Sequence, residues 1–294
     1  MTERDQDRLL IIGNPTSGGF NGTLLETIAE LLRSAGRSVT LQLTSRAGEI
    51  GKTCADPDLE YGTVIVAGGD GSINEALSGL SQSSKQTALA VVPTGTANVL
   101  ALELGIPHSA DALAKIILQG KTTPLHYGLV NDHLFVLMAS CGFDAAIVHQ
   151  TPLALKRWFG KLAYVATTLK LMISYKGQDL LIKTETGAEI HCRIAVISNA
   201  GRYGGYTILP NDSVTQAGLT LLTLDADDRL SILRFGINFL LGRLAETSGV
   251  KTTAIQQAAI SCASKVPVQV DGDPFGFTPV DIQVASGTVP ILVP

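Results

Sequence analysis

A glycine-rich turn with a single carboxylate follows a β-branched run in the first third of the chain. The run Val64–Ala67 is typical of a buried strand, and Gly68-Gly69-Asp70-Gly71-Ser72 follows it directly. Glycines let the backbone approach a ligand closely, and a helix beginning at Ser72 would offer free N–H groups to an anion. An acidic side chain inside a phosphate-binding turn is explained when a divalent cation lies between it and the phosphates. The turn therefore predicts a site for a nucleotide with Mg²⁺, although short glycine patterns also occur in simple tight bends.

Two further turns have the same kind of composition. Gly13–Gly19 follows the predicted strand 9–13, and Pro93–Asn98 follows a predicted strand that ends at Val92. Carboxyl ends of parallel strands meet at one edge of an open α/β sheet, which is where such sheets bind ligands. Three turns of this composition favour a phosphate site over three unrelated bends.

A second carboxylate pair, Asp271-Gly272-Asp273, follows the predicted strand 266–270 near the end of the chain. Asp-Gly is a common hairpin turn, and local chemistry favours that interpretation. The alternative is that one carboxylate faces a nucleotide held by a first domain, across a cleft between two domains. Both interpretations stay open at this point.

Strands and helices alternate in residues 9 to about 124. Aliphatic runs predict strands, and apolar periodicity with glycine stops at Gly36, Gly105 and Gly120 predicts helices. Capping boxes are expected at Thr23–Glu26 and Ser72–Glu75. The expected strands are 9–13, 39–44, 63–67 and 89–92, and the expected helices are 24–34, 72 onward, 96–104 and 109–119. This alternation predicts an α/β domain with a parallel sheet covered on both faces.

The pattern changes near Pro124 to short strands separated by turn residues. These strands are expected at 126–130, 133–138, 193–198, 219–224, 266–270 and 281–284, with helices at 155–174 and 230–245. The second half is thus predicted to be mainly antiparallel β, of the β-sandwich kind. We expect domains at 1–124 and 125–285, with residues 286–294 packing back on the first.

Composition excludes several classes of protein. The chain has 294 residues, 45% of them hydrophobic and 16% charged, with a net charge of −4, which describes a folded protein and argues against a nucleic-acid binder. Four scattered cysteines and five scattered histidines predict neither disulfides nor a metal cluster, as expected in a reducing cytoplasm. The charged first eight residues do not resemble a signal peptide. No run of about 18 uncharged apolar residues occurs, so we expect a cytoplasmic protein that at most lies peripherally on the inner face of the membrane.

Four motifs in this order resemble the diacylglycerol kinase catalytic-domain family, which includes bacterial soluble lipid kinases, sphingosine kinases and ceramide kinases. They are Asn14-Pro15-Thr16-Ser17-Gly18, Gly68–Ser72, Pro93–Asn98 and Asp271–Asp273, and the resemblance covers nearly the whole chain. It implies a phosphofructokinase-like N-terminal domain and a β-sandwich-like substrate domain. It also implies an ATP-dependent kinase acting on a lipid hydroxyl, such as that of diacylglycerol, in phospholipid metabolism.

The resemblance also implies roles for particular residues. Asp70 would act through Mg²⁺, and Asp273 stands where the family has the glutamate that is its proposed general base. ATP would be contacted, by motif position, by Asn14, Ser17, Thr44, Gly68, Gly69, Asp70, Gly71, Ser72 and Thr96.

Three positions depart from the family pattern. Asp273 is one methylene shorter than glutamate, which puts the reach of the base in doubt. Ala217-Gly218 stands where relatives carry Asp-Gly, a ligand of a structural Mg²⁺, and Val99 replaces a frequent acidic residue. A catalytically weak or inactive nucleotide- or lipid-binding regulator is therefore an alternative. NAD kinase, which shares the Gly-Gly-Asp-Gly turn, is another.

Lys156–Lys161 combines cations with Trp158 and Phe159 and continues as an apolar run through Met172. Such a mixture suits the headgroup region of a membrane, and a helix packed in the core is the alternative. The expected partner is a lipid presented at a membrane surface, not nucleic acid. The identity of the lipid and any homo-oligomer are left open by the sequence.

Overall fold

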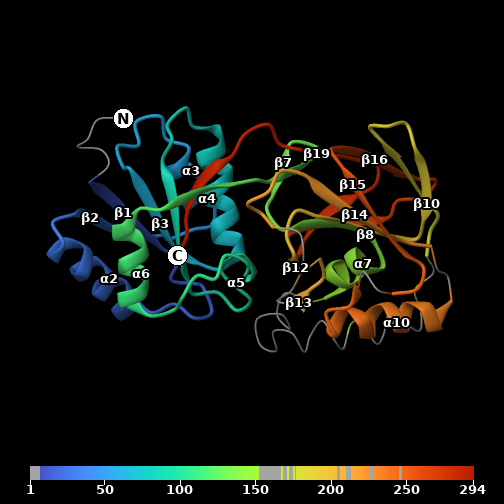
Figure 1. Ribbon diagram of the computed structural model, residues 1–294, viewed down its shortest axis with the longest axis horizontal. Coiled ribbons are helices and arrows are strands. Elements are labelled where there is room, and N and C mark those ends of the chain that lie inside the picture. The colour runs from blue at the N-terminus through green and yellow to red at the C-terminus, as the bar shows by residue number, and fades with distance from the viewer. Residues whose placement is uncertain are drawn as a thin grey trace. The chain divides into compact units, whose positions relative to one another are not determined.

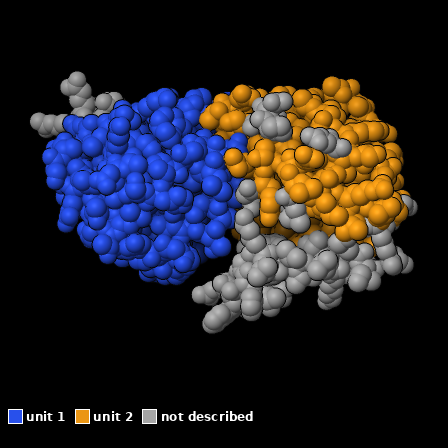
Figure 2. All heavy atoms as spheres, turned by 60° about the horizontal axis from the view of Figure 1, so that its bottom comes forward, with its two compact units in different colours: residues 1–126, 286–294 blue, residues 127–285 orange. Residues whose placement is uncertain are grey.

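The computed structural model describes residues 7–151, 167, 171, 175, 177–203, 206–209, 213–225, 228–244 and 247–294. The chain forms two compact units (Figures 1 and 2). Unit 1 comprises residues 1–126 and 286–294, and unit 2 comprises residues 127–285. The sequence-based boundary at residue 124, with 286–294 assigned to the first domain, lies within three residues of this division.

Unit 1 is built on a six-stranded sheet with the order β2-β1-β3-β4-β20-β5. Its strands are β1 (Arg8–Gly13), β2 (Ser38–Leu43), β3 (Thr63–Gly68), β4 (Ala88–Pro93), β5 (Thr122–Leu125) and β20 (Val289–Leu292). Strands β1 to β4 are parallel, β20 runs parallel to β4, and β5 is antiparallel to β20. The central strands β1, β3 and β4 are buried over nearly their full length, which explains their uninterrupted aliphatic sequences.

Helices cover both faces of this sheet (Figure 1). They are α2 (Gly22–Ser34), α3 (Glu49–Cys54), α4 (Asp70–Gln82), α5 (Val99–Glu103) and α6 (Ala110–Gln119). Helix α2 packs beside α6, and α3 packs beside α4. The predicted parallel α/β domain is confirmed, with α3, β5 and β20 as elements that the sequence pattern did not indicate.

Both predicted capping boxes are wrong. Helix α2 begins at Gly22, where the Leu24 N–H donates to Asn21 Oδ1 at 3.1 Å. Helix α4 begins at Asp70 rather than Ser72 and has no side-chain cap. The reason at α4 is tertiary, because Ser72 Oγ accepts from Asn14 Nδ2 and Glu75 Oε2 accepts from the Gly48 N–H.

Unit 2 contains two six-stranded antiparallel sheets, with the orders β10-β9-β16-β19-β6-β7 and β15-β14-β11-β8-β17-β18. The first sheet consists of β6 (Gly128–Val130), β7 (His133–Phe135), β9 (Leu180–Thr184), β10 (Glu189–Cys192), β16 (Gln257–Cys262) and β19 (Val280–Val284). The second consists of β8 (Met138–Gly142), β11 (Ile194–Ser198), β14 (Leu219–Leu224), β15 (Val250–Ile255), β17 (Pro267–Val270) and β18 (Asp273–Phe277). Side chains of both sheets share one buried core, for example Phe135 and Ile260 with Ile197 and Val268. The predicted β-sandwich is confirmed.

Other elements of unit 2 lie outside the two sheets. They are α7 (Phe143–Gln150), the short pair β12 (Arg202–Tyr203) and β13 (Tyr206–Thr207), and α10 (Arg229–Leu240). Helix α7 packs against β8 and β17 of the second sheet. The strands expected at 126–130 and 133–138 form an antiparallel hairpin, β6–β7, around Asn131 and Asp132, although the second strand ends at Phe135 and the chain enters the second sheet at Met138. Helix α10 matches the helix expected at 230–245, whereas that expected at 155–174 lies mostly outside the described residues. None of the helices in the described ranges combines the length and hydropathy needed to cross a bilayer.

Candidate active site

Three turns meet at the carboxyl edge of the sheet in unit 1. We call Asn14–Gly19 the first turn, Gly68–Ser72 the second turn and Thr94–Asn98 the third turn. The Asn14 N–H donates to the Ala67 carbonyl at 2.9 Å, the Thr94 N–H donates to the Gly68 carbonyl at 3.1 Å, and the Gly19 N–H donates to the Thr94 carbonyl at 2.8 Å. The predicted convergence of these turns is confirmed by direct backbone hydrogen bonds among them.

Side chains of the first turn also hold the other two turns. Asn14 Nδ2 donates to Ser72 Oγ at 3.0 Å, and Ser17 Oγ lies 3.0 Å from Thr94 Oγ1 in a hydrogen bond. Asn14 Oδ1 in turn accepts from the N–H and the hydroxyl of Thr16 at 3.0 and 2.8 Å. Asn14 therefore shapes the edge of the sheet through its own hydrogen bonds.

The glycines of these turns differ in the space that surrounds them. A Cβ on Gly95 would lie 2.4 Å from Gly69 Cα, and a Cβ on Gly68 would lie 2.4 Å from Ser72 Cβ. Glycine is required at residue 95 because the second and third turns touch through their backbones, and at residue 68 because the Ser72 side chain of the same turn lies against it. Gly71 is exposed, and a Cβ there would meet nothing within 4 Å. Gly71 thus has the open space above the start of α4 that a ligand would need.

Asp70 joins the second turn to the start of α5. Its Oδ2 accepts from the Val99 N–H and its Oδ1 accepts from the Leu100 N–H, both at 3.1 Å. The side chain of Val99 is 4% exposed, so the apolar residue at this position packs in the core. No sequence pattern indicates this link, which depends on the starts of α4 and α5 lying side by side.

A carboxylate oxygen that accepts one N–H retains a further lone pair for a cation. Within the described ranges, no three acidic, histidine or cysteine side chains lie close enough to hold a metal ion together. Mg²⁺ in kinases is usually bound through one or two carboxylates plus substrate phosphates, so Asp70 alone fits this kind of site. Ala217 is exposed and residues 210–212, shortly before it, lie outside the described residues, so the expected loss of a second metal site stays a prediction.

Thr44 and Thr96 are the two other residues expected to contact ATP, and the first lies beside the turns and the second within the third turn. Thr44 follows β2, where its N–H donates to the Gly13 carbonyl at 2.9 Å and its hydroxyl donates to the same oxygen at 3.4 Å. Thr96 is exposed on the third turn, with its Oγ1 only 3.1 Å from where a Cβ on Gly18 would lie. Asn98 closes this turn with a left-handed φ of 48° and with hydrogen bonds to both backbone groups of Gly95. This conformation is why α5 begins at Val99 and not at Thr96.

In unit 2, Asp271 and Gly272 form the two-residue turn of the β17–β18 hairpin. Their φ values of 49° and 86° are those of a type I′ turn. The hairpin interpretation is therefore confirmed. Asp273, the predicted base, is exposed at the first position of β18.

The carboxylate of Asp271 binds the chain where it crosses between the two sheets. Its Oδ2 accepts from the Val136 N–H, and its Oδ1 accepts from the N–H groups of Leu137 and Met138, all at 2.8 Å. Three charge-assisted hydrogen bonds make this aspartate an anchor for the turn. The Asp-Gly pair in the sequence predicts the turn but not this anchoring role.

A polar cluster behind this turn was not indicated by the sequence analysis. Gln269 is fully buried, its Oε1 accepts from the Gly272 N–H at 2.8 Å, and its Nε2 donates to Ser140 Oγ at 2.9 Å. Ser140 donates to the carboxylate of Asp144, to which the Tyr203 hydroxyl also donates at 2.6 Å. Burial raises the pKa of Asp144, against the opposing effect of the hydrogen bonds from Ser140, Tyr203 and Gln269. The signal in the sequence is Asp144 itself, the one acidic residue of α7, followed by the apolar run Ala145–Val148.

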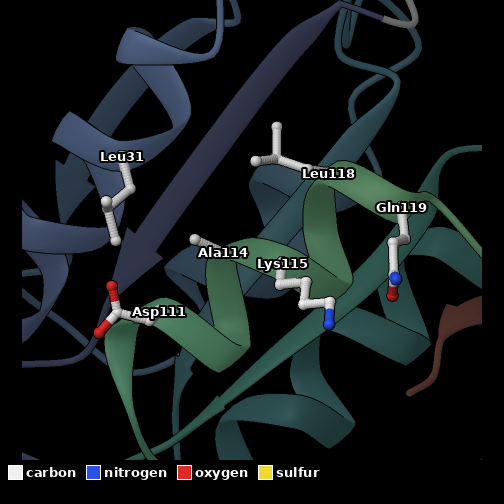
Figure 3. A pocket seen from close by; sticks show the side chains of 6 residues that line it. All are labelled: Leu31, Asp111, Ala114, Lys115, Leu118 and Gln119. Atoms are coloured by element: carbon white, nitrogen blue, oxygen red, sulfur yellow. The ribbon is translucent and has the colours of Figure 1, made fainter.

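A depression of about 390 Å³ lies between α2 and α6 (Figure 3). Its lining residues are Leu31, Asp111, Ala114, Lys115, Leu118 and Gln119. None of the residues of the three turns lines it, so it is separate from the candidate site.

Unit 1 with its three turns is a parallel α/β domain, and unit 2 is an antiparallel β-sandwich. Comparison with known families agrees with this division. Residues 8–130 match the diacylglycerol kinase catalytic domain, and residues 138–293 match the YegS C-terminal NAD kinase beta sandwich-like domain.

Individual relatives extend over most of the chain. A diacylglycerol kinase of Bacillus subtilis is 28% identical over 281 residues, which cover 92% of this chain and 91% of that protein. A Klebsiella pneumoniae protein named probable lipid kinase YegS-like is 30% identical, with 72% of each chain covered. The crystal structure of a diacylglycerol kinase from Bacillus anthracis has the same fold, with a TM-score of 0.80 at 20% identity over 100% of this chain and 99% of that one.

The chain belongs to the diacylglycerol kinase catalytic-domain family and carries the YegS-type C-terminal domain of that family. It is an ATP-dependent lipid kinase. This assignment agrees with the resemblance of the four motifs and decides against NAD kinase.

Proposed function

We propose that the enzyme transfers the γ-phosphate of ATP to the hydroxyl of diacylglycerol or a related membrane lipid, with Mg²⁺. The observation that carries the proposal is the bond of Asp70 to α5, which locks the second and third turns into one rigid edge beside the exposed Gly71. The names of the relatives from Bacillus subtilis and Klebsiella pneumoniae support a lipid substrate.

Phosphoryl transfer depends on positioning and on neutralising charge more than on covalent chemistry. The first N–H groups of a helix have no acceptor within it, and α4, with 13 residues and no side-chain cap, leaves such donors beside Gly71. These donors and the positive end of the helix would bind the phosphates of ATP. Asn14, Ser17, Thr44, Ser72 and Thr96 keep the surrounding turns in place for this role or contact the nucleotide directly.

Two carboxylates would bind the metal ion and accept the proton. Asp70 would hold Mg²⁺, which offsets the negative charge of the transferring phosphoryl group when it is bound. Asp273 would accept the proton of the lipid hydroxyl as the oxygen attacks phosphorus. The β17–β18 turn presents this side chain to solvent, and Asp271 and Gln269 hold the turn rigid.

The test is a kinase assay with labelled ATP and dispersed diacylglycerol. Asp70→Asn keeps one oxygen as an acceptor but loses the charge, so we expect kcat to fall by about 10²–10³-fold, as for loss of one preorganised electrostatic contact. Asp111→Asn, a matched change of an exposed aspartate in the first turn of α6, should leave turnover intact. Full activity of Asp70→Asn would remove this residue from the mechanism.

The same assay separates the two carboxylates. For Asp273→Asn we expect kcat to fall by about 10²–10⁴-fold, the usual contribution of a positioned base, while ATP binding measured by calorimetry is unchanged. Asp281→Asn, at another exposed aspartate of unit 2, is the control. ATP binding by the wild type without phosphate transfer to any lipid would instead favour the regulator.

A further inference from the structure

Helix α10 of unit 2 carries a stripe of exposed apolar side chains. Leu230, Leu233, Ile237 and Leu241 are 54%, 40%, 47% and 63% exposed, and their spacing of three, four and four residues places them on one helix face. The Leu241 N–H donates to the Ile237 carbonyl at 3.0 Å, so the helical turn continues to the last of them. We call this set the α10 stripe.

Most of the large hydrophobic side chains that are exposed in the described part of the chain belong to the stripe. Seven large hydrophobic side chains are exposed there, four of them in the stripe, whereas Leu43, Leu102 and Phe277 are on three other elements or their ends. The concentration of four such side chains on one helix face is typical of an interaction surface.

The opposite face of α10 is already used for packing. Ile232 and Phe235 are 4% and 8% exposed, so this face of the helix is buried. A helix that is apolar on both faces is normally buried all round, so α10 has more apolar surface than the fold of unit 2 requires.

The cations on and just after α10 indicate the partner. Residues 229–244 contain three arginines and no acidic residue, and the nearest acidic residues, Asp227, Asp228 and Glu246, lie before and after this range. Arg234 lies about 40° around the helix from Leu230, given about 100° per residue, and it is exposed, as is Arg243 just beyond the helix. Apolar side chains with adjacent arginines match a bilayer that contains anionic lipids, where the stripe enters the acyl boundary and the cations stay at the headgroups.

We propose that the α10 stripe, with Arg234 and Arg243, docks the enzyme on an anionic membrane surface. The proposal rests on the proposed function, because a kinase of bilayer lipids must reach a hydroxyl at the membrane interface. A second copy of the chain is the less suitable partner, since pairing one stripe with another about a twofold axis would bring arginines of like charge together. Apolar and cationic contributions are each modest, so the docking is reversible and weakens at high salt.

Co-sedimentation with vesicles tests the surface directly and needs no catalysis. The wild type should bind vesicles of equimolar phosphatidylcholine and phosphatidylglycerol more tightly than vesicles of phosphatidylcholine alone. The Leu233→Gln/Ile237→Gln variant should bind the anionic vesicles at least about tenfold more weakly, because two inserted side chains are lost. Arg234→Gln leaves the stripe intact and should lower the affinity about fivefold and reduce its dependence on salt.

Phe277→Gln is the matched control, since Phe277 is 50% exposed in the same unit but lies on β18. Equal vesicle binding by the wild type and the double variant would overturn the proposal, and so would an equal loss in Phe277→Gln. Conversion of a wild-type dimer to a monomer in the double variant, measured by sedimentation, would also overturn it and assign the stripe to a second copy. Turnover of lipid dispersed in detergent micelles is measured in parallel, so that a missing kinase activity is separated from a missing membrane contact.

Discussion

At the scale of single residues, several polar side chains of this enzyme are occupied by backbone groups. Asp70 accepts from two N–H groups at the start of α5, Asp271 accepts from three N–H groups between β7 and β8, and Gln269 accepts from Gly272. The contacts of Asp70 and Asp271 join segments that are far apart in the chain, whereas that of Gln269 lies within the β17–β18 turn. The exposed residues Gly71 and Asp273 are presented by turns that these contacts hold in place.

The buried carboxyl of Asp144 should make the stability of the enzyme depend on pH, because burial raises its pKa above the ordinary value of 3.8. Between these two pKa values the native state keeps a proton that the unfolded chain has released. The raised pKa therefore contributes stability that is full below the unfolded pKa and is lost as pH rises through the folded pKa. Asp144→Asn removes this dependence, so the stability of the wild type relative to this variant should fall as pH is raised above 3.8.

Urea unfolding of both proteins at a series of pH values measures the difference. Asp281→Asn, at an exposed position, serves as the reference substitution. A wild-type-minus-variant difference that stays constant across the series would show that Asp144 titrates as it does in the unfolded chain.

At the scale of elements, close packing of α3 against α4 depends on Gly79. A Cβ on this residue would lie 2.4 Å from the Gly51 carbonyl oxygen and 2.6 Å from Cys54 Cβ. Both neighbours belong to a helix that cannot move without disturbing the buried Ile50 and Cys54. Gly71 is on the same helix, and a Cβ there would meet nothing within 4 Å.

Substitution of these two glycines should have opposite effects on the free energy of unfolding. Gly79→Ala is expected to lower the free energy of unfolding by about 1–3 kcal/mol through overpacking. Gly71→Ala should leave stability unchanged or raise it by about 0.5–1 kcal/mol, because alanine favours the helix. Chemical denaturation of both variants measures this difference, and equal stabilities would contradict the packing argument for α3 and α4.

At the scale of the whole molecule, the end of the chain returns to unit 1. Strand β20 lies between β4 and β5, and its Val289, Ile291 and Leu292 are 2%, 0% and 1% exposed. The last nine residues therefore complete the sheet that carries the three turns, although the intervening chain forms unit 2.

Truncation after Ala285 should unfold unit 1 and leave unit 2 folded. Each of the three buried side chains contributes about 1.5–3 kcal/mol, and their sum approaches the whole stability of a typical domain. We expect loss of ATP binding in calorimetry and rapid proteolysis confined to residues 1–126. Removal of Pro294 alone, which follows β20, is the control. Retained nucleotide binding by the longer truncation would show that the sheet does not need β20.

Local sequence patterns were sufficient to predict many of the strands and helix ends of unit 1. The aliphatic runs of β1, β3 and β4 predict buried strands because both of their faces are covered, and Gly120 ends α6 with a φ of 65° as the stop at this residue predicted. The capping boxes failed because Ser72 and Glu75 bind Asn14 and Gly48 instead, which are remote in sequence.

The sequence by itself determined the parallel α/β domain, the β-sandwich and the three turns at one sheet edge, because each depends on residue types within a few positions. Only the tertiary structure decided that Asp70 binds α5, that Asp271 and Gln269 hold the β17–β18 turn, and that β20 completes the first sheet. The physical reason is that the contacts of Asp70, of Asp271 and of Gln269 with Ser140 join segments separated by 29 to 135 residues, and β20 pairs with β4 and β5 from much earlier in the chain. Their partners become neighbours only when the sheets and helices have packed.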